Sequence, residues 1–212
     1  MKLIHFGKER MRKIFRIYLI VVLCLPVWIE AQTKQIPYKV LLQTPVKVLT
    51  FDQLKITMLR RLNEMRAEEN RLHPKRMVKL NPFKYSMKLE ELGFYYIAHK
   101  NPYKIFDKTQ PNGLDVWVHW DNDSNGVIDR FRRLNVKYIK VIKYDSPKRT
   151  SGEIISIGEN VVSTNGSINE LCNALKKSPG HWRWIKSPVI THVGFGYKND
   201  FPLIVQEFAK LE

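Results

Sequence analysis

Cysteine is scarce in this chain, which has only Cys24 and Cys172 among 212 residues. Cys24 lies in an apolar N-terminal segment that we expect to be removed on export, so Cys172 would remain alone. A fold stapled by intramolecular disulfides is therefore excluded, although export leads to an oxidising compartment. With 44% apolar residues, the chain must rely on one hydrophobic core. We expect Cys172 to be a small buried hydrophobe in that core.

Long apolar runs are also missing. The apolar N-terminal run, residues 17–28, has twelve residues, whereas a membrane-spanning helix needs about twenty. Basic residues precede the run and Ala31 follows it, which is typical of a secretory signal. We predict that residues 1–31 are a cleaved signal peptide and that the protein is secreted or periplasmic. An uncleaved membrane anchor is the alternative, and a lipoprotein through Cys24 is disfavoured because Leu23 precedes it.

Acidic residues are few, since 20 Asp and Glu stand against 36 Lys and Arg. Six of the basic and two of the acidic residues lie within the first 31, so cleavage would leave a charge of +12. Such a charge favours an anionic envelope polymer as partner, or serves solubility alone. The basic residues are scattered, which favours solubility. No motif indicates a specific nucleic acid, and we expect a bilayer to be contacted only through an uncleaved signal.

Three helices are predicted from capping and apolar spacing. Thr50 and Gln53 form a capping box ahead of a stripe made of Leu54, Met58, Leu62 and Met65. Ser86 can cap a second helix, whose stripe is Leu89, Leu92, Tyr96 and Ile97, although Gly93 weakens it. Residues 167–177 form a third helix, which Pro179 and Gly180 should end. These helices place the start of the main domain at residue 50.

The remaining segments predict strands and connecting loops. Residues 32–49 contain two prolines and short β-prone runs, and we expect a strand or an extended arm there. Residues 134–144 are expected to form a strand or hairpin arm, and residues 189–196 and 203–208 the last two strands. Helices flanking mixed strands predict an α/β fold.

Four short motifs follow one another in the second half of the chain. They are Gly158-Glu159-Asn160-Val161, Ser178-Pro179-Gly180-His181, Val193-Gly194-Phe195-Gly196 and Val205-Gln206-Glu207-Phe208-Ala209. Their order and spacing resemble the C-terminal half of a CAP domain, the fold of cysteine-rich secretory, antigen 5 and pathogenesis-related proteins. The cysteine-poor, SCP-like bacterial branch is the most similar. The resemblance implies a three-layer α-β-α sandwich over residues 50–212, with a mixed, largely antiparallel sheet.

The resemblance also implies a cleft with two histidines and two glutamates. Glu159 matches one glutamate, His181 the second histidine, and His119 the first. Ser178 stands at or near the position of the second glutamate, so one carboxylate is missing. His119, Glu159 and His181 could still hold zinc with an open fourth position. Each residue also has a purely structural interpretation. Glu159 could bind backbone N–H groups at a strand end, and His181 could be a loop histidine bonded to a helix end. His119 could pack in an aromatic cluster.

Two tryptophans and an acidic loop lie close to these residues in the sequence. Trp120 and Trp182 could line a ligand groove, or they could pack in the core. Asp121, Asp123 and Asn125 have the spacing of a calcium loop, but the position of its last ligand is occupied by Arg132. A plain Asp/Asn/Gly turn is the simpler interpretation. We therefore expect no cofactor, with zinc and calcium as alternatives.

Function is narrowed to two hypotheses by these residues. The first is an exported, non-catalytic CAP module that binds a peptide, lipid or glycan in a cleft around His119, Glu159 and His181. The second is a metal-assisted hydrolase, in which Glu159 positions or deprotonates water while a histidine polarises the substrate. The missing glutamate favours the first. Whether the protein is an enzyme stays open at this point.

Overall fold

The structure, a computed structural model, describes residues 36–99, 119, 126–143, 153–200 and 202–212. The predicted signal, Cys24, Trp120 and the predicted calcium ligands Asp121, Asp123 and Asn125 lie outside these residues. Residues Tyr38–Glu212 form one compact unit, which contains every helix and strand of the described chain. Within the described residues, no helix combines the length and the apolarity needed to cross a membrane.

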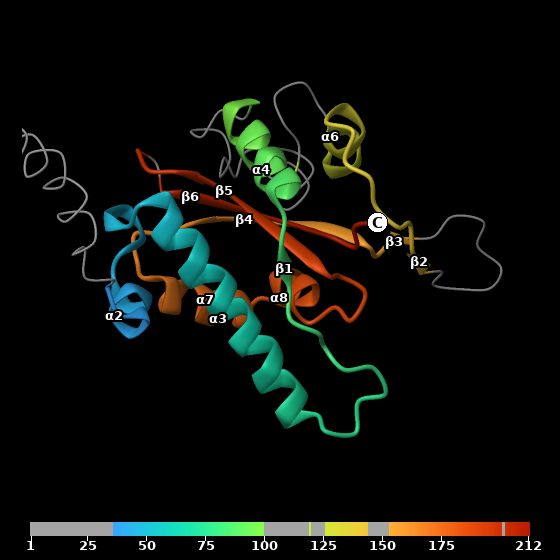
Figure 1. Ribbon diagram of the computed structural model, residues 1–212, viewed down its shortest axis with the longest axis horizontal. Helices are drawn as coiled ribbons and strands as arrows, with labels where there is room; N and C mark the ends of the chain where they lie inside the picture. Colours follow the sequence, from blue (N-terminus) through green and yellow to red (C-terminus); the bar gives the residue numbers. More distant parts are fainter. Residues whose placement is uncertain (1–35, 100–118, 120–125, 144–152, 201) are drawn as a thin grey trace, which may run out of the picture. The chain divides into compact units, whose positions relative to one another are not determined.

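Helices and strands are interspersed along the chain of this unit (Figure 1). The elements are α2 (Tyr38–Gln43), η1 (Val46–Val48), α3 (Phe51–Leu72), β1 (Lys84–Tyr85), α4 (Met87–His99), α6 (Val127–Arg133), β2 (Ile142–Lys143), β3 (Glu153–Ile154), β4 (Ile157–Ser163), α7 (Ile168–Lys177), α8 (Pro179–Ile185), β5 (His192–Lys198) and β6 (Leu203–Ala209).

The centre of the unit is a four-stranded sheet in the order β1-β5-β6-β4. Strand β1 runs parallel to β5, whereas β5, β6 and β4 are antiparallel neighbours. A separate two-stranded sheet is formed by β2 and β3. Helix α4 covers one face of the main sheet, and α3, α7 and α8 cover the other (Figure 1). The predicted α/β fold class, a sandwich with a mixed and largely antiparallel sheet, is therefore confirmed.

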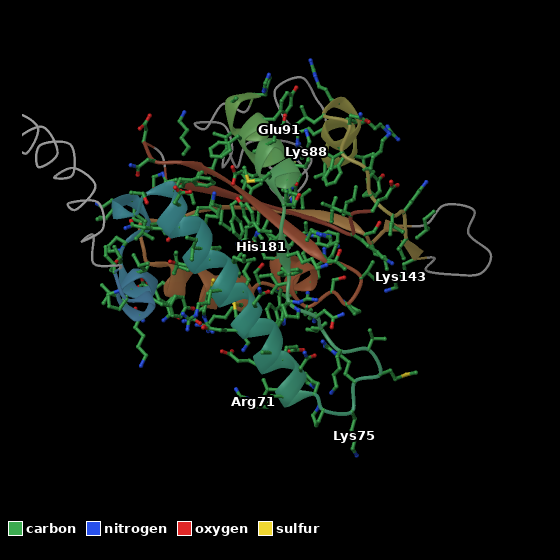
Figure 2. All side chains as sticks on the ribbon, viewed as in Figure 1. Arg71, Lys75, Lys88, Glu91, Lys143 and His181 are labelled. Carbon is green, nitrogen blue, oxygen red and sulfur yellow. The ribbon has the colours of Figure 1, made fainter. Side chains whose placement is uncertain are left out.

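Alternation along β6 separates the two halves of the core. Ile204 and Phe208 pack with the buried stripes of α3, α7 and α8. Leu203 and Val205 pack with Tyr96 of α4 on the opposite face. Because neighbouring strand residues point to opposite faces, one strand can seal both layers at once. Side chains consequently fill both interfaces of the sheet (Figure 2).

Helix α3 forms as the capping pattern predicts. Thr50 accepts a hydrogen bond from the Gln53 amide, the Gln53 side chain returns the bond, and the predicted stripe is buried. Asn63 on this helix bonds both backbone groups of Phe83. Arg66 is buried and donates to the carbonyls of Asn81, Ile185 and Ser187, at 2.6, 2.8 and 3.0 Å. This helix therefore clamps loops that are distant in sequence.

Helix α4 approaches the sheet unusually closely because glycines face one another there. Its predicted cap is present, since the Leu89 amide donates to the Ser86 hydroxyl over 3.4 Å. Gly93 lies against Gly196 of β5, where a Cβ on Gly196 would come within 2.4 Å of the Gly93 carbonyl carbon. A Cβ on Gly194 would come within 2.3 Å of the Glu90 nitrogen. Gly194 and Gly196 therefore allow the backbones of β5 and α4 to approach closely.

Helix α7 and its surroundings agree with prediction in most details. Ser167 and Glu170 form a capping box, and Cys172 is a free, fully buried thiol. Burial raises the pKa of that thiol to about 12. The predicted stop at Pro179 and Gly180 is only half correct, because α7 ends but α8 begins at Pro179. Proline is well suited to the first turn of a helix, where its missing N–H costs nothing.

Three segments differ from the sequence-based expectation. The expected strand or arm before residue 50 contains the short helices α2 and η1, with Val46 fully buried against the domain. Within 134–143, only β2 and an isolated bridge of Tyr138 to Leu211 are extended pairings. Helix α6 was not predicted. In each case tertiary packing overrides a weak local preference.

We predict that Gly196→Ala destabilises the fold by about 1–3 kcal/mol, because its Cβ would meet backbone that cannot move aside. The matched control is Gly180→Ala, since a Cβ there meets nothing within 4 Å. Urea denaturation should show a lower midpoint for the first variant and an unchanged or higher midpoint for the second. Equal midpoints would contradict the close approach of α4 to β5.

Candidate functional site

Glu159 occupies the middle of strand β4, and its side chain is completely buried. One carboxylate oxygen, Oε1, lies 2.8 Å from Nδ1 of His119. The other, Oε2, accepts a hydrogen bond from the Arg130 guanidinium. Both oxygens of this carboxylate are therefore engaged by residues from different parts of the chain.

Arg130 links this carboxylate to helix α6 and to the segment that carries His119. Its side chain is fully buried, and its Nη1 donates to the His119 carbonyl over 3.0 Å. The guanidinium carbon lies 4.7 Å from the centre of the buried Tyr96 ring. A buried charge requires a counter-ion, and Glu159 supplies it. Arg130 therefore positions both the histidine and the glutamate.

A second buried carboxylate, Glu207, faces the same cluster. It is the cross-strand partner of Glu159 in the β4–β6 register, and its Oε1 lies 3.8 Å from Arg130. Its side chain is fully buried, and within the described part of the chain no N–H or hydroxyl group donates to it. Two buried carboxylates thus share one guanidinium.

Burial and charge push the pKa values of the two glutamates apart. Burial raises the pKa of Glu159, but the Arg130 charge and the His119 hydrogen bond outweigh it, so the net shift is downward. Burial, followed by the negative charge of Glu159, raises the pKa of Glu207 well above its usual range. Glu159 is therefore ionised near neutral pH, while Glu207 keeps its proton and can donate it in a hydrogen bond to Glu159.

A cavity of about 260 Å³ opens beside this cluster. Its lining includes His119, Glu159 and Arg183, and its apolar walls include Ile128 and Trp184. The Trp184 ring lies directly against Gly158, where a Cβ would come within 2.3 Å of it. The Arg183 guanidinium lies over that ring, 4.2 Å from its centre. The cavity thus combines an aromatic wall with polar groups at its edge.

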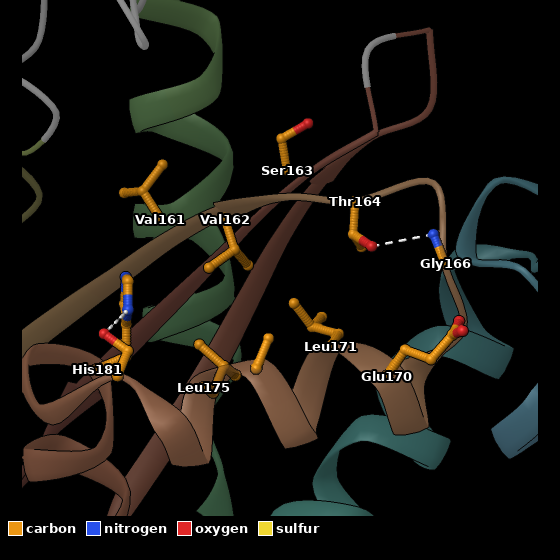
Figure 3. A pocket seen from close by; sticks show the side chains of 11 residues that line it. Val161, Val162, Ser163, Thr164, Gly166, Glu170, Leu171, Leu175 and His181 are labelled. Atoms are coloured by element: carbon orange, nitrogen blue, oxygen red, sulfur yellow. Dashed lines mark hydrogen bonds between the residues drawn. The ribbon is translucent and has the colours of Figure 1, made fainter.

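His181 belongs to a different cavity, which corrects the predicted single cleft. Its Nδ1 lies 2.8 Å from the Ser178 hydroxyl, and its carbonyl accepts a hydrogen bond from Asn160. Figure 3 shows it at one end of a cavity of about 620 Å³ between β4 and α7. Asn160 and Glu159 are consecutive on β4 and so point to opposite faces of the sheet. His119 and Glu159 come together, and His181 lies apart from them.

The predicted zinc ligands do not fit a metal site in this arrangement. Among the described residues, which include His119, Glu159 and His181, no group of three His, Cys, Asp or Glu side chains could hold a metal ion. Each oxygen of Glu159 already has a partner, one of them the cationic Arg130. A guanidinium that is hydrogen-bonded to a carboxylate competes with a metal ion for the same oxygen lone pairs, and its positive charge repels the ion.

The two predicted ligand tryptophans have different outcomes. Trp182 belongs to the core cluster that α3, α7 and α8 form with the sheet, and it is only 9% exposed. It is not among the residues that line the cavity of His119 or the cavity of His181. Trp120 lies outside the described residues. Trp184 lines the cavity next to His119. Asp129, which lies within the predicted calcium loop, accepts a hydrogen bond from the Gly126 amide at the start of α6.

Sequence reasoning missed Arg130 and Glu207 as members of the site. Glu207 had a usable signal, since it is the only acid in the otherwise apolar and amide-bearing strand β6. An acid in a strand that is buried on both faces must find a partner. Arg130 had a weaker signal, because it lies among Arg132 and Arg133 on a short basic helix. Only the fold shows which of the three is buried.

Comparisons with known proteins give structural likeness only. No protein-family model matches the chain, and no curated protein does. An extracellular protein containing an SCP domain from Bacillus anthracis matches at 13% identity and a TM-score of 0.46, over 76% of this chain and 44% of that protein. An outer surface protein from Borrelia burgdorferi matches at 16% identity and a TM-score of 0.45, over 73% of this chain and 90% of that one.

A third similar structure is a cysteine-rich secretory protein from Staphylococcus aureus. It has 13% identity and a TM-score of 0.44, over 73% of this chain and 38% of that protein. The chain therefore spans less than half the length of the first and third of these proteins.

We predict that neutralising Glu159 lowers the unfolding free energy much more than neutralising Glu207 does. Glu159→Gln removes the carboxylate that bonds Arg130 directly and leaves only Glu207, 3.8 Å away, to ionise as its counter-ion. It should therefore cost more than about 1 kcal/mol of unfolding free energy, up to the ~3–5 kcal/mol of a broken buried ion pair. Glu207→Gln replaces a neutral carboxyl by a neutral amide and should cost less than about 1 kcal/mol near pH 4.5. Urea denaturation of both variants at a series of pH values measures this difference.

The pH dependence separates the two variants further. The folded-state pKa of Glu207 is raised, so the folded protein holds a proton that the unfolded chain releases as the pH rises. The wild type therefore loses stability above the unfolded-state pKa, and Glu207→Gln does not. The unfolding free energy of Glu207→Gln should therefore rise relative to that of the wild type between pH 4.5 and 8. A difference that stays constant over this range would mean that Glu207 is ionised in the fold.

Proposed function

We propose that this chain is an exported, SCP-like CAP module that binds a small ligand or peptide without catalysis. The proposal places the ligand in the cavity between His119 and Trp184. Export is supported by the basic and apolar N-terminal segment, and the module by the four motifs and the α/β sandwich. Secretion and release into a periplasm are both compatible with this proposal.

The proposal that the module is not catalytic is supported by one observation: both oxygens of the Glu159 carboxylate already have hydrogen-bond partners. A general base needs a lone pair within reach of a water molecule and a pKa near the working pH. Glu159 has one oxygen on Arg130 and the other on His119, and its pKa is lowered. Such a carboxylate is a poor base and a poor metal ligand. Its role is to hold His119 at the rim of the cavity.

The metal-assisted hydrolase has less support. It would need Glu159 free to activate water and His181 near His119. Glu159 is instead bonded to Arg130, and His181 and His119 line different cavities.

The lining of the cavity indicates the kind of ligand. Ile128, Ile157 and Trp184 offer apolar and aromatic contact, while His119 and Arg183 offer polar groups. A flat apolar group carrying a carboxylate would match both parts. Benzoate is the simplest probe with this chemistry.

We predict that benzoate shifts the amide signals of Ile128 and Gly158 and the indole signal of Trp184 in a saturable way. Heteronuclear NMR on the full chain measures these shifts. Ile128→Trp should abolish them by filling the cavity. Ala174→Trp is the matched control, because it adds the same side chain to the cavity of His181 and should leave them unchanged.

Two outcomes would contradict the proposal. The first is the absence of saturable shifts, or their persistence in Ile128→Trp, which would remove the binding site. The second comes from zinc calorimetry on the same protein. One-to-one zinc binding that is lost in His119→Ala would favour the hydrolase instead.

A further inference from the structure

A second surface lies where helix α3 ends, and it extends to Arg183 and Trp184 at the edge of the His119 cavity. Residues 71–79, here called the basic loop, read Arg-Leu-His-Pro-Lys-Arg-Met-Val-Lys. No acidic residue occurs between Glu69 and Glu90, a stretch that contains six Lys and Arg. Figure 2 labels Arg71 and Lys75 at this end of the unit. The local charge is therefore of one sign.

Three large apolar side chains are exposed within the same nine residues. Met77 is 99% exposed, Leu72 63% and Val78 57%. A single exposed apolar residue needs no explanation, but a group of them marks an interaction surface. The basic loop is amphipathic, because these apolar side chains are interspersed with four basic residues along it. Solubility alone does not account for an apolar tip on a basic loop.

The basic loop is held in one shape by specific hydrogen bonds. The Arg76 amide donates to the His73 carbonyl over 3.1 Å, and Lys79 Nζ donates to the Pro74 carbonyl over 2.7 Å. Arg76 also pairs with Glu69, and Asn70 bonds both backbone groups of Leu80. The apolar tip is consequently presented by a preformed turn, which lowers the entropic cost of binding.

A cavity of about 730 Å³ separates the basic loop from α8 and β2. Four cationic residues line it, namely Arg76, Lys143, Arg183 and Lys186, and none of the acidic residues that the structure describes does. Met77, Val78 and Trp184 form part of its apolar wall. Three elements thus converge on one surface that is apolar at its centre and cationic at its edges.

We propose that this surface docks on an anionic phospholipid bilayer. Met77 and Val78 enter the boundary between headgroups and acyl chains, while Lys75, Lys79 and the cavity lysines contact lipid phosphates. An acidic polymer would be recognised by the charges alone and would leave the apolar tip without a partner. This proposal departs from the sequence-based expectation that a bilayer is contacted only through an uncleaved signal.

The test uses an environment-sensitive fluorophore at position 77 of the full chain. Met77→Cys is combined with Cys24→Ser, and buried Cys172 does not react. The vesicles contain phosphatidylcholine with or without phosphatidylglycerol, and the acyl chains carry bromine as a quencher. We expect quenching with phosphatidylglycerol vesicles only, and loss of quenching in high salt.

Two matched controls keep the readout specific to the basic loop. Ile56→Cys places the same fluorophore on an exposed site of α3, sixteen residues before Leu72 and therefore about 24 Å away along the helix; it should not be quenched. Lys75→Gln with Lys79→Gln should weaken vesicle binding about tenfold. Lys39→Gln with Lys47→Gln removes the same charge elsewhere and should have little effect. The N-terminal segment is present in every variant.

Three results would overturn the proposal. The first is the absence of quenching at position 77 with anionic vesicles. The second is equal quenching at positions 56 and 77. The third is heparin binding that depends on Lys75 and Lys79 while Met77→Ser with Val78→Ser leaves vesicle binding unchanged, which would assign the surface to an acidic polymer.

Discussion

The pairing of Arg130 with Glu159 is the interaction on which the site depends. A guanidinium buried against the Tyr96 ring is stable only beside an anion, because desolvation of an unpaired charge costs several kcal/mol. Glu159 supplies the anion from the edge strand of the sheet. The pair therefore fixes α6 against β4, and the Arg130 bond to the His119 carbonyl brings the histidine to the same place.

Glu207 shows how one charge determines the state of another. It lies across from Glu159 in the strand register and is equally buried. With a single guanidinium available, only one of the two carboxylates can be ionised at low cost. Since Arg130 bonds Glu159 directly, Glu207 is the one that keeps its proton. The cluster of Arg130, Glu159 and Glu207 then has no net charge.

The helices were predictable where local signals and burial agree. The capping boxes at Thr50 and Ser167 and the stripes behind them place α3 and α7 almost to the residue. Gly93 looked like a weakness in the second helix, and the structure shows that its small size is what allows α4 to lie on Gly196. The short helices α2 and α6 were not predicted, because their few residues are stabilised by contacts with distant segments rather than by propensity.

The sequence by itself determined the α/β class, the scarcity of cross-links, the three longer helices, the last two strands and the importance of Glu159. These features depend on periodicity, capping and burial, which are local or act within one element. Only the tertiary structure decided which polar groups meet. Residues 159 and 160 are neighbours in the chain, yet strand alternation sends one toward Arg130 and the other toward His181. That geometric rule could not be applied before the strand and its neighbours were placed, and the fold puts His119 and His181 in two different cavities instead of the single predicted cleft.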